Sequence, residues 1–173
     1  MATTIFEITP TATDKLYGKA LNEHIQRFPE DSWICVRDRD TAYLPGVDSG
    51  AIMQRAIEKY PGMTLFSCST NRSWGQKMDD NPNIIDHIHK AKEMSLNESY
   101  KPIKGIVPAH FWLFPRALWV KHPFDNNPII HRANSFDVRW TRFMNCRKIK
   151  IEHLYLFHIY RLGSDVKSFE HLL

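Results

Sequence analysis

Short apolar segments alternate with amphipathic helical segments along this sequence. That order predicts an α/β fold, with a mostly parallel sheet, helices on both of its faces and a late strand that can run antiparallel. Residues 33–36 and 64–68 carry the prediction, because nearly continuous apolar runs of this length are typical of strands buried on both faces. A helix start at Asp48-Ser49 and a stop at Tyr60-Pro61-Gly62 lie between the two runs.

The first elements are predicted to be a strand, a helix and a second strand. Residues 5–8 are β-prone and end at Thr9-Pro10, and Thr13-Asp14 can cap the helix that follows. That helix carries Leu16, Ala20, Ile25 and Phe28 on one side. Pro29-Glu30-Asp31 breaks it and leads into the strand at 33–36.

The alternation continues through the middle of the chain. A helix from Asp48 to about Lys59 precedes the strand at 64–68. A polar stretch at 69–82 then leads into a helix near 84–94.

Strand, helix, helix and strand complete the prediction. A strand at 106–114 leads into a helix begun by Pro115 in a first-turn position. After a long loop, Ser135 opens another helix. Residues 148–160 contain β-branched and aromatic residues and are predicted to be the last strand.

The composition indicates one folded domain, residues 1–173, with 43% hydrophobic and 24% charged residues. Its three cysteines form no disulfide framework and no zinc-binding pair, which favours the reducing cytoplasm. No stretch approaches the ~20 apolar residues of a membrane span, so we expect none. A net charge of +4 suits an anionic ligand without requiring nucleic acid, and we expect no nucleic-acid partner.

Asp38-Arg39-Asp40 follows the most apolar predicted strand directly. In α/β sheets, ligands bind beyond the carboxyl ends of the strands. Residues i and i+2 of an extended chain point the same way, so both carboxylates can face one site. Such oxygen ligands suit Mg²⁺ or Mn²⁺. The alternative is a solvated strand end at which Arg39 pairs with one of the acids.

Three further side chains could take part in chemistry. His158 emerges from the last strand and becomes a candidate ligand if that strand ends beside Asp40; otherwise it is a histidine of the core or its rim. Arg161 would then be well placed for a phosphate, since its guanidinium offers a planar fork of donors. Asp137 lies at the start of a helix. It is either simply an acidic residue that the helix dipole favours at this position, or a general base.

Several common motifs are absent. The glycines form no phosphate-binding loop, and no serine or cysteine nucleophile signature is present. His87 and His89 diverge by about 200° on a helix, so they are not expected to chelate a metal. A basic group is interpreted as a solvated face: Arg139, Arg142, Arg147, Lys148 and Lys150.

Five segments of the sequence, taken together, are informative about the family. The first three are a helix start at 15–22, a strand with the Asp-x-Asp pair at 33–44, and a strand and Thr-Asn-Arg loop at 66–72. The other two are a strand and helix at 111–119, and a helix and final strand within 135–161. Together they resemble the short GT-A-type glycosyltransferases related to glycosyltransferase family 2, found in bacteria and their phages. The resemblance covers roughly residues 6–163.

The resemblance implies a GT-A-like fold and a nucleoside-diphosphate sugar donor bound through Mn²⁺ or Mg²⁺. It implies that Asp40 ligates the metal directly, that His158 completes the metal shell, and that Asp38 faces the ribose or a metal-bound water. Asp137 would deprotonate an acceptor hydroxyl in an inverting displacement. The residues expected to bind the donor are Asp38, Asp40, Arg72 and Arg161.

The chain also departs from the family pattern. Only residues 4–13 precede the helix start, so the fold is expected to be shortened at its N-terminus and the base-binding pocket reduced. Diphosphates of uridine, guanosine and cytidine are then expected to bind within about one order of magnitude of one another. Pro108-Ala109-His110 stands where the family often has Ser-Gly.

The leading prediction is therefore a metal-dependent, inverting glycosyltransferase that acts on an unknown glycan or other hydroxyl acceptor. One alternative is a degenerate GT-A-like domain that binds a nucleotide, glycan or protein without turnover. Another is a metal-dependent phosphoesterase that uses the same carboxylates.

Overall fold

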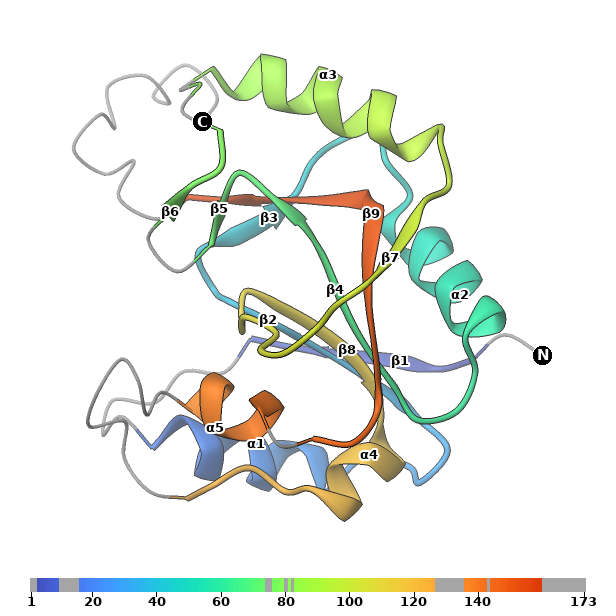
Figure 1. Ribbon diagram of the computed structural model, residues 1–173, viewed down its shortest axis with the longest axis vertical. Helices are drawn as coiled ribbons and strands as arrows, with labels where there is room; N and C mark the ends of the chain where they lie inside the picture. Colours follow the sequence, from blue (N-terminus) through green and yellow to red (C-terminus); the bar gives the residue numbers. More distant parts are fainter. Residues whose placement is uncertain are drawn as a thin grey trace.

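The computed structural model describes residues 3–9, 16–73, 76–79, 81, 83–126, 136–142 and 144–159, the side chains of residues 76, 77, 136 and 137 excepted (Figure 1). The helices in this part of the chain are α1 (Tyr17–Ile25), α2 (Ser49–Lys59), α3 (Ile84–Ser95), α4 (Arg116–Lys121) and α5 (Phe136–Arg142). The strands are β1 (Ile5–Ile8), β2 (Trp33–Arg37), β3 (Thr41–Tyr43), β4 (Thr64–Thr70), β5 (Arg72–Ser73), β6 (Gln76–Lys77), β7 (Tyr100–Pro102), β8 (Phe111–Pro115) and β9 (Arg147–His158).

Seven of the described strands form one sheet. Its order is β1-β2-β8-β4-β9-β3, with β7 also paired with β9, and β5 and β6 form a separate hairpin. β1, β2, β4 and β9 run in one direction, whereas β8, β3 and β7 run in the other.

The predicted α/β class is confirmed, but the sheet is mixed rather than mostly parallel. Four strands share a direction, yet antiparallel β8 lies between β2 and β4. A strand such as Phe111–Pro115, buried on both faces, has a continuous apolar sequence whichever way it runs. The apolar sequence of β8 therefore predicted that it is a strand, but not the direction in which it runs.

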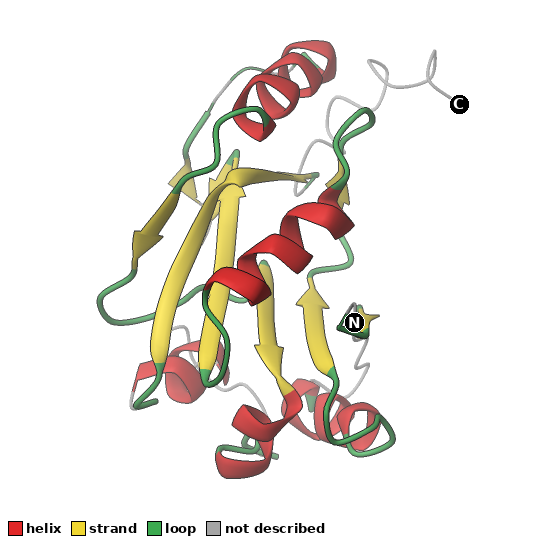
Figure 2. Cartoon of the chain, turned by 90° about the vertical axis from the view of Figure 1, so that its right-hand side faces the viewer, coloured by secondary structure: helices red, strands yellow, loops and turns green. Residues whose placement is uncertain are grey.

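Helices cover both faces of the sheet, as predicted. Along β2, Trp33 and Cys35 pack with α2 in one apolar cluster. Ile34 and Val36 face the other way and pack with α1, α4 and the Trp140 side chain of α5. Figure 2 shows α2 crossing one face of the sheet, and α1, α4 and α5 lie at the bottom of the view. The alternation of side chains thus gives the central strands two cores.

β9 turns sharply midway along its length (Figure 1). Its first half runs parallel to β4, but the register shifts between Cys68, opposite Ile151, and Ser69, opposite Tyr155. The Ser69 hydroxyl donates to the carbonyl of Glu152 at 2.9 Å. At this irregularity the Ser69 side chain therefore satisfies the Glu152 carbonyl, which has no place in the regular ladder with β4.

The second half of β9 pairs with β3. This pairing brings together two segments that are far apart in the sequence and that both contribute residues to the site. Thr41 lies opposite His158, and Tyr43 lies opposite Leu156. β3 and β7 were not predicted, because three-residue strands have too little periodicity to recognise. β8 begins at Phe111, later than the predicted 106.

Most helix boundaries follow their sequence signals. The Asp48 side chain accepts from the Ala51 amide at 2.8 Å and caps α2 as predicted. α1 begins at Tyr17 instead of near the Thr13-Asp14 pair, which lies outside the described residues. Among the described helices, none has the length and apolar character needed to cross a membrane.

A matched pair of leucines tests the buried core. Leu113 of β8 is 0% exposed, whereas Leu96 after α3 is 82% exposed. Leu113→Ala is expected to lower the free energy of unfolding by about 2–5 kcal/mol, and Leu96→Ala to change it by less than about 0.5 kcal/mol. Urea denaturation followed by circular dichroism measures both, and equal losses would contradict the core described above.

Candidate metal centre

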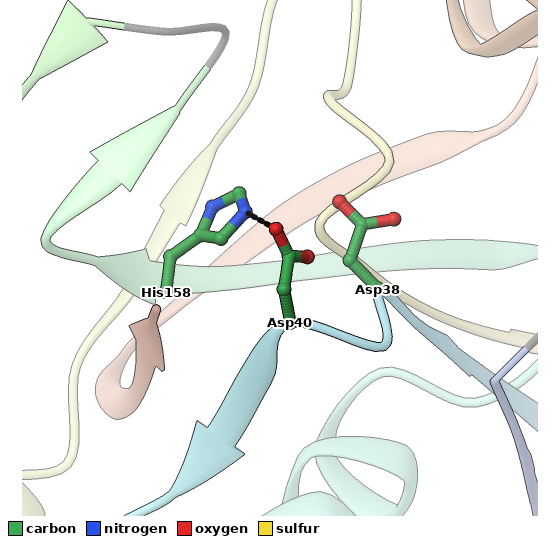
Figure 3. A group of neighbouring side chains, drawn as sticks. All are labelled: Asp38, Asp40 and His158. Atoms are coloured by element: carbon green, nitrogen blue, oxygen red, sulfur yellow. Dashed lines mark ion pairs between the residues drawn. The ribbon is translucent and has the colours of Figure 1, made fainter. Parts of the chain in front are cut away.

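The two aspartates lie on a tight turn between β2 and β3. The Thr41 amide and hydroxyl both donate to the Asp38 carbonyl, at 3.1 and 2.6 Å. The Asp38 amide donates to the carbonyl of His110 at 3.3 Å, which fixes the start of the turn. The expected extended conformation is therefore wrong: a turn, and not strand alternation, brings the carboxylates of Asp38 and Asp40 to one side (Figure 3).

His158 reaches these carboxylates from the end of β9. The Ile159 amide donates to the Asp40 carbonyl at 2.6 Å, and His158 Nε2 lies 3.2 Å from Asp40 Oδ2. One potential ligand atom from each of Asp38, Asp40 and His158 lies within 4.8 Å of the others. The convergence expected for these strand ends is observed, with Asp40 between the other two side chains in Figure 3.

The orientation of the His158 ring is set by its second nitrogen. Nδ1 lies 3.2 Å from the Arg72 carbonyl, and because a carbonyl only accepts, Nδ1 must be the donor. Nε2 is then the nitrogen that faces the carboxylates. This is the arrangement by which an outer hydrogen bond fixes a metal-binding imidazole.

The three side chains fit a divalent cation. Two ionised carboxylates this close repel each other, and a divalent ion between them would relieve the repulsion. The Asp40 side chain is 37% exposed and that of His158 is 11% exposed, so the group opens to solvent on its carboxylate side. Carboxylates suit Mg²⁺ and Mn²⁺, and the imidazole favours a transition metal. The group therefore offers two carboxylates and one imidazole as potential ligands of a divalent cation.

A polar network supports the turn from behind. Arg37 Nε and Nη2 each lie 3.0 Å from Glu7 Oε1, and Arg37 Nη1 also donates to the Thr41 carbonyl. The Tyr43 hydroxyl donates to Glu7 Oε2 at 2.8 Å. The Arg37 guanidinium thereby ties the end of β2 to the start of β3, across the turn that carries both aspartates.

Cysteine chemistry does not account for this region. Burial raises the pKa of the Cys35 thiol to about 12, and burial also raises the pKa of Tyr43, with Cys35 as the next cause. Burial raises the pKa of Cys68 as well. These thiols stay protonated near neutral pH, which agrees with the absence of a cysteine nucleophile motif.

The remaining candidate residues are only partly located. The Arg72 carbonyl contacts His158, and the expected role of Arg72 in donor binding stays a prediction. Asp137 lies in α5, with its side chain outside the described residues, and Arg161 lies outside them altogether. His87 is buried in α3, between the Tyr155 hydroxyl and the Asn81 carbonyl, each 2.8 Å from a ring nitrogen, so both ring nitrogens have partners within the protein.

Sequence reasoning missed Asn71 and the pair formed by Glu7 and Arg37. Glu7 and Arg37 are charged residues of opposite sign within two apolar strands, a signal that could have identified a pair between neighbouring strands. Asn71 stands in the Thr-Asn-Arg segment, but only Arg72 was given a role there. No signal in the sequence alone shows that the Asn71 carboxamide bonds to His158.

Comparison of the chain with models of known protein families and with curated proteins finds no match.

The network behind the turn predicts an asymmetric response to two similar substitutions. Glu7→Gln replaces the acceptor of two Arg37 donors and the Tyr43 hydroxyl, and is expected to lower the free energy of unfolding by about 1–3 kcal/mol. Glu23→Gln removes only an exposed contact of 3.9 Å with Lys19 and is expected to cost less than about 0.5 kcal/mol. Chemical denaturation compares the two; a cost for Glu7→Gln no greater than that for Glu23→Gln would rule out a supporting role for the network.

Proposed function

We propose that this chain is a metal-dependent glycosyltransferase with a GT-A-like fold, which transfers a sugar from a nucleoside-diphosphate donor to a hydroxyl acceptor. The observation that supports the proposal most is the convergence of His158 with Asp38 and Asp40, from which it is far in the sequence. The order of the five motif segments in the sequence supplies the choice of family.

In this proposal Asp40 and His158 hold the divalent cation, Mn²⁺ or Mg²⁺, and Asp38 lies beside it as a further ligand or a partner of the ribose. When bound, the ion would neutralise charge on the departing nucleoside diphosphate. The carboxylate side of the group is open to solvent, so diphosphate oxygens can approach from there. Arg72 and Arg161 are proposed to contact the donor.

The proposed reaction is an inverting displacement with Asp137 as general base. Asp137 takes the proton of the acceptor hydroxyl, whose oxygen forms a bond to the anomeric carbon of the sugar. The bond between that carbon and the diphosphate oxygen breaks, and the nucleoside diphosphate leaves with the electron pair. A base positioned in this way typically accelerates transfer by about 10²–10⁴-fold.

Removal of one ligand tests the metal site. Asp40→Ala is expected to weaken Mn²⁺ binding by more than the about 10–100-fold that loss of an outer-shell partner costs, because it deletes a direct ligand. Asp31→Ala, at an exposed turn position, is the matched control and should leave Mn²⁺ affinity unchanged. Isothermal titration of the folded variants measures both, and unchanged affinity in Asp40→Ala would reject the site.

A panel of sugar nucleotides with Mn²⁺ tests the reaction class. Release of nucleoside diphosphate supports a glycosyltransferase. Tight binding without release would indicate a domain that binds without turnover, and release of inorganic phosphate from simple nucleotides without an acceptor would indicate a phosphoesterase.

Asp137 is expected to affect transfer and not donor binding. Asp137→Asn should leave donor affinity within a few-fold and lower the transfer rate by about 10²–10⁴, because the base acts on the acceptor. Calorimetry for the donor and a product assay for transfer separate the two effects. Equal loss of affinity and rate would contradict the role of general base.

A further inference from the structure

The carboxamide of Asn71 brackets the backbone of His158. The His158 amide donates to Asn71 Oδ1 at 2.7 Å, and Asn71 Nδ2 donates to the His158 carbonyl at 3.2 Å. The regular pairing of β4 with β9 extends only to Thr70 opposite Leu156. The side chain of Asn71 therefore satisfies both backbone groups of His158 where the β4 backbone no longer does, and it is buried, with 8% exposed.

Residues 70–72, which join β4 to β5 and are called the 70–72 turn below, also hold the ring of His158. The residue after Asn71 supplies the carbonyl that accepts from Nδ1. The Thr70 hydroxyl donates to that Arg72 carbonyl at 3.1 Å, and the Arg72 amide lies 3.3 Å from the same hydroxyl oxygen. Backbone and ring of the candidate ligand are thus both fixed by residues 70–72.

The 70–72 turn is itself anchored to the segment beyond the β5–β6 hairpin. The Asn71 carbonyl accepts from the amides of Met78 and Asp79 at 2.8 and 3.1 Å. Asp79 in turn pairs with Lys90 of α3. Asn71 can therefore hold its position independently of His158, which is the condition for one residue to position another.

We propose that Asn71 is a positioning residue of the metal centre. It seats the end of β9 so that His158 Nδ1 reaches the Arg72 carbonyl and Nε2 faces Asp40. Without the carboxamide, the end of β9 loses two hydrogen bonds and the ring loses its fixed orientation, although all three potential ligands are still present. The inference rests on the proposed function in one respect, that Asp38, Asp40 and His158 bind a divalent cation.

The test compares Asn71→Leu, which keeps the bulk of the side chain, and Asn71→Ala with the control Asn83→Ala. Asn83 caps α3 by accepting from the Ile85 amide at 3.0 Å, so the control also removes an asparagine hydrogen bond to backbone. Titration with Mn²⁺ is expected to show an about 10–100-fold loss of affinity in both Asn71 variants and less than about a two-fold change in the control. Affinity in the Asn71 variants within two-fold of the original protein, or an equal loss in the control, would overturn the proposal.

Nitrogen-15 spectra of the histidine rings provide a readout that simple destabilisation would not move. In the original protein, Nδ1 of His158, which donates to the Arg72 carbonyl, should be protonated, and the ring signals of His158 should be altered in Asn71→Leu. The signals of His87, which has its own partners, should not change. This readout needs no metal, so it tests Asn71 even if the protein binds no Mn²⁺ and the proposed function fails. If neither Asn71 variant folds, the original protein decides: protonated Nε2 with unprotonated Nδ1 at His158 would overturn the proposal.

Discussion

The pairing of β3 with the second half of β9 brings the candidate site together. β9 first runs through the centre of the sheet beside β4, then changes direction and meets β3, so that Thr41 lies opposite His158. The register of β4 with β9 shifts at that change, and there the Ser69 hydroxyl donates to the Glu152 carbonyl. The contacts between His158 and the Asp38–Asp40 turn depend on the pairing of β3 with β9, because these two segments are far apart in the sequence.

Around this pairing, the structure surrounds a group of like charges with fixed polar partners. Arg37 and Glu7 lie behind the turn, the Arg72 carbonyl fixes the His158 ring, and Asn71 fixes its backbone. Two carboxylates held close together repel each other, and a divalent cation between them would relieve that repulsion. A site that holds repelling groups together is more readily understood as one organised for a cation, and this is the physical basis of the proposed function.

Much of the fold could be predicted from the sequence, because the periodicity of apolar residues and the capping residues act locally: α2 begins after its predicted cap, and α3 begins at the predicted residue 84. The direction of β8 and the existence of β3 could not, since both depend on which strands meet in space. For the site, the position of Asp38 and Asp40 after a buried strand was predictable, but not the turn that orients them. Asn71 was not predicted, because its role depends on contact with His158, and the identity of a single residue does not indicate which distant residue it contacts.

The most direct test of the account is a crystal grown with Mn²⁺ and a nucleoside diphosphate, with the anomalous scattering of manganese measured. We expect one manganese peak within bonding distance of Asp40 and of His158 Nε2, with diphosphate oxygens on its exposed side and the Nδ1 contact to the Arg72 carbonyl retained. Manganese bound elsewhere, or its absence while His158 stays against Asp40 at saturating Mn²⁺, would show that these residues form no metal centre.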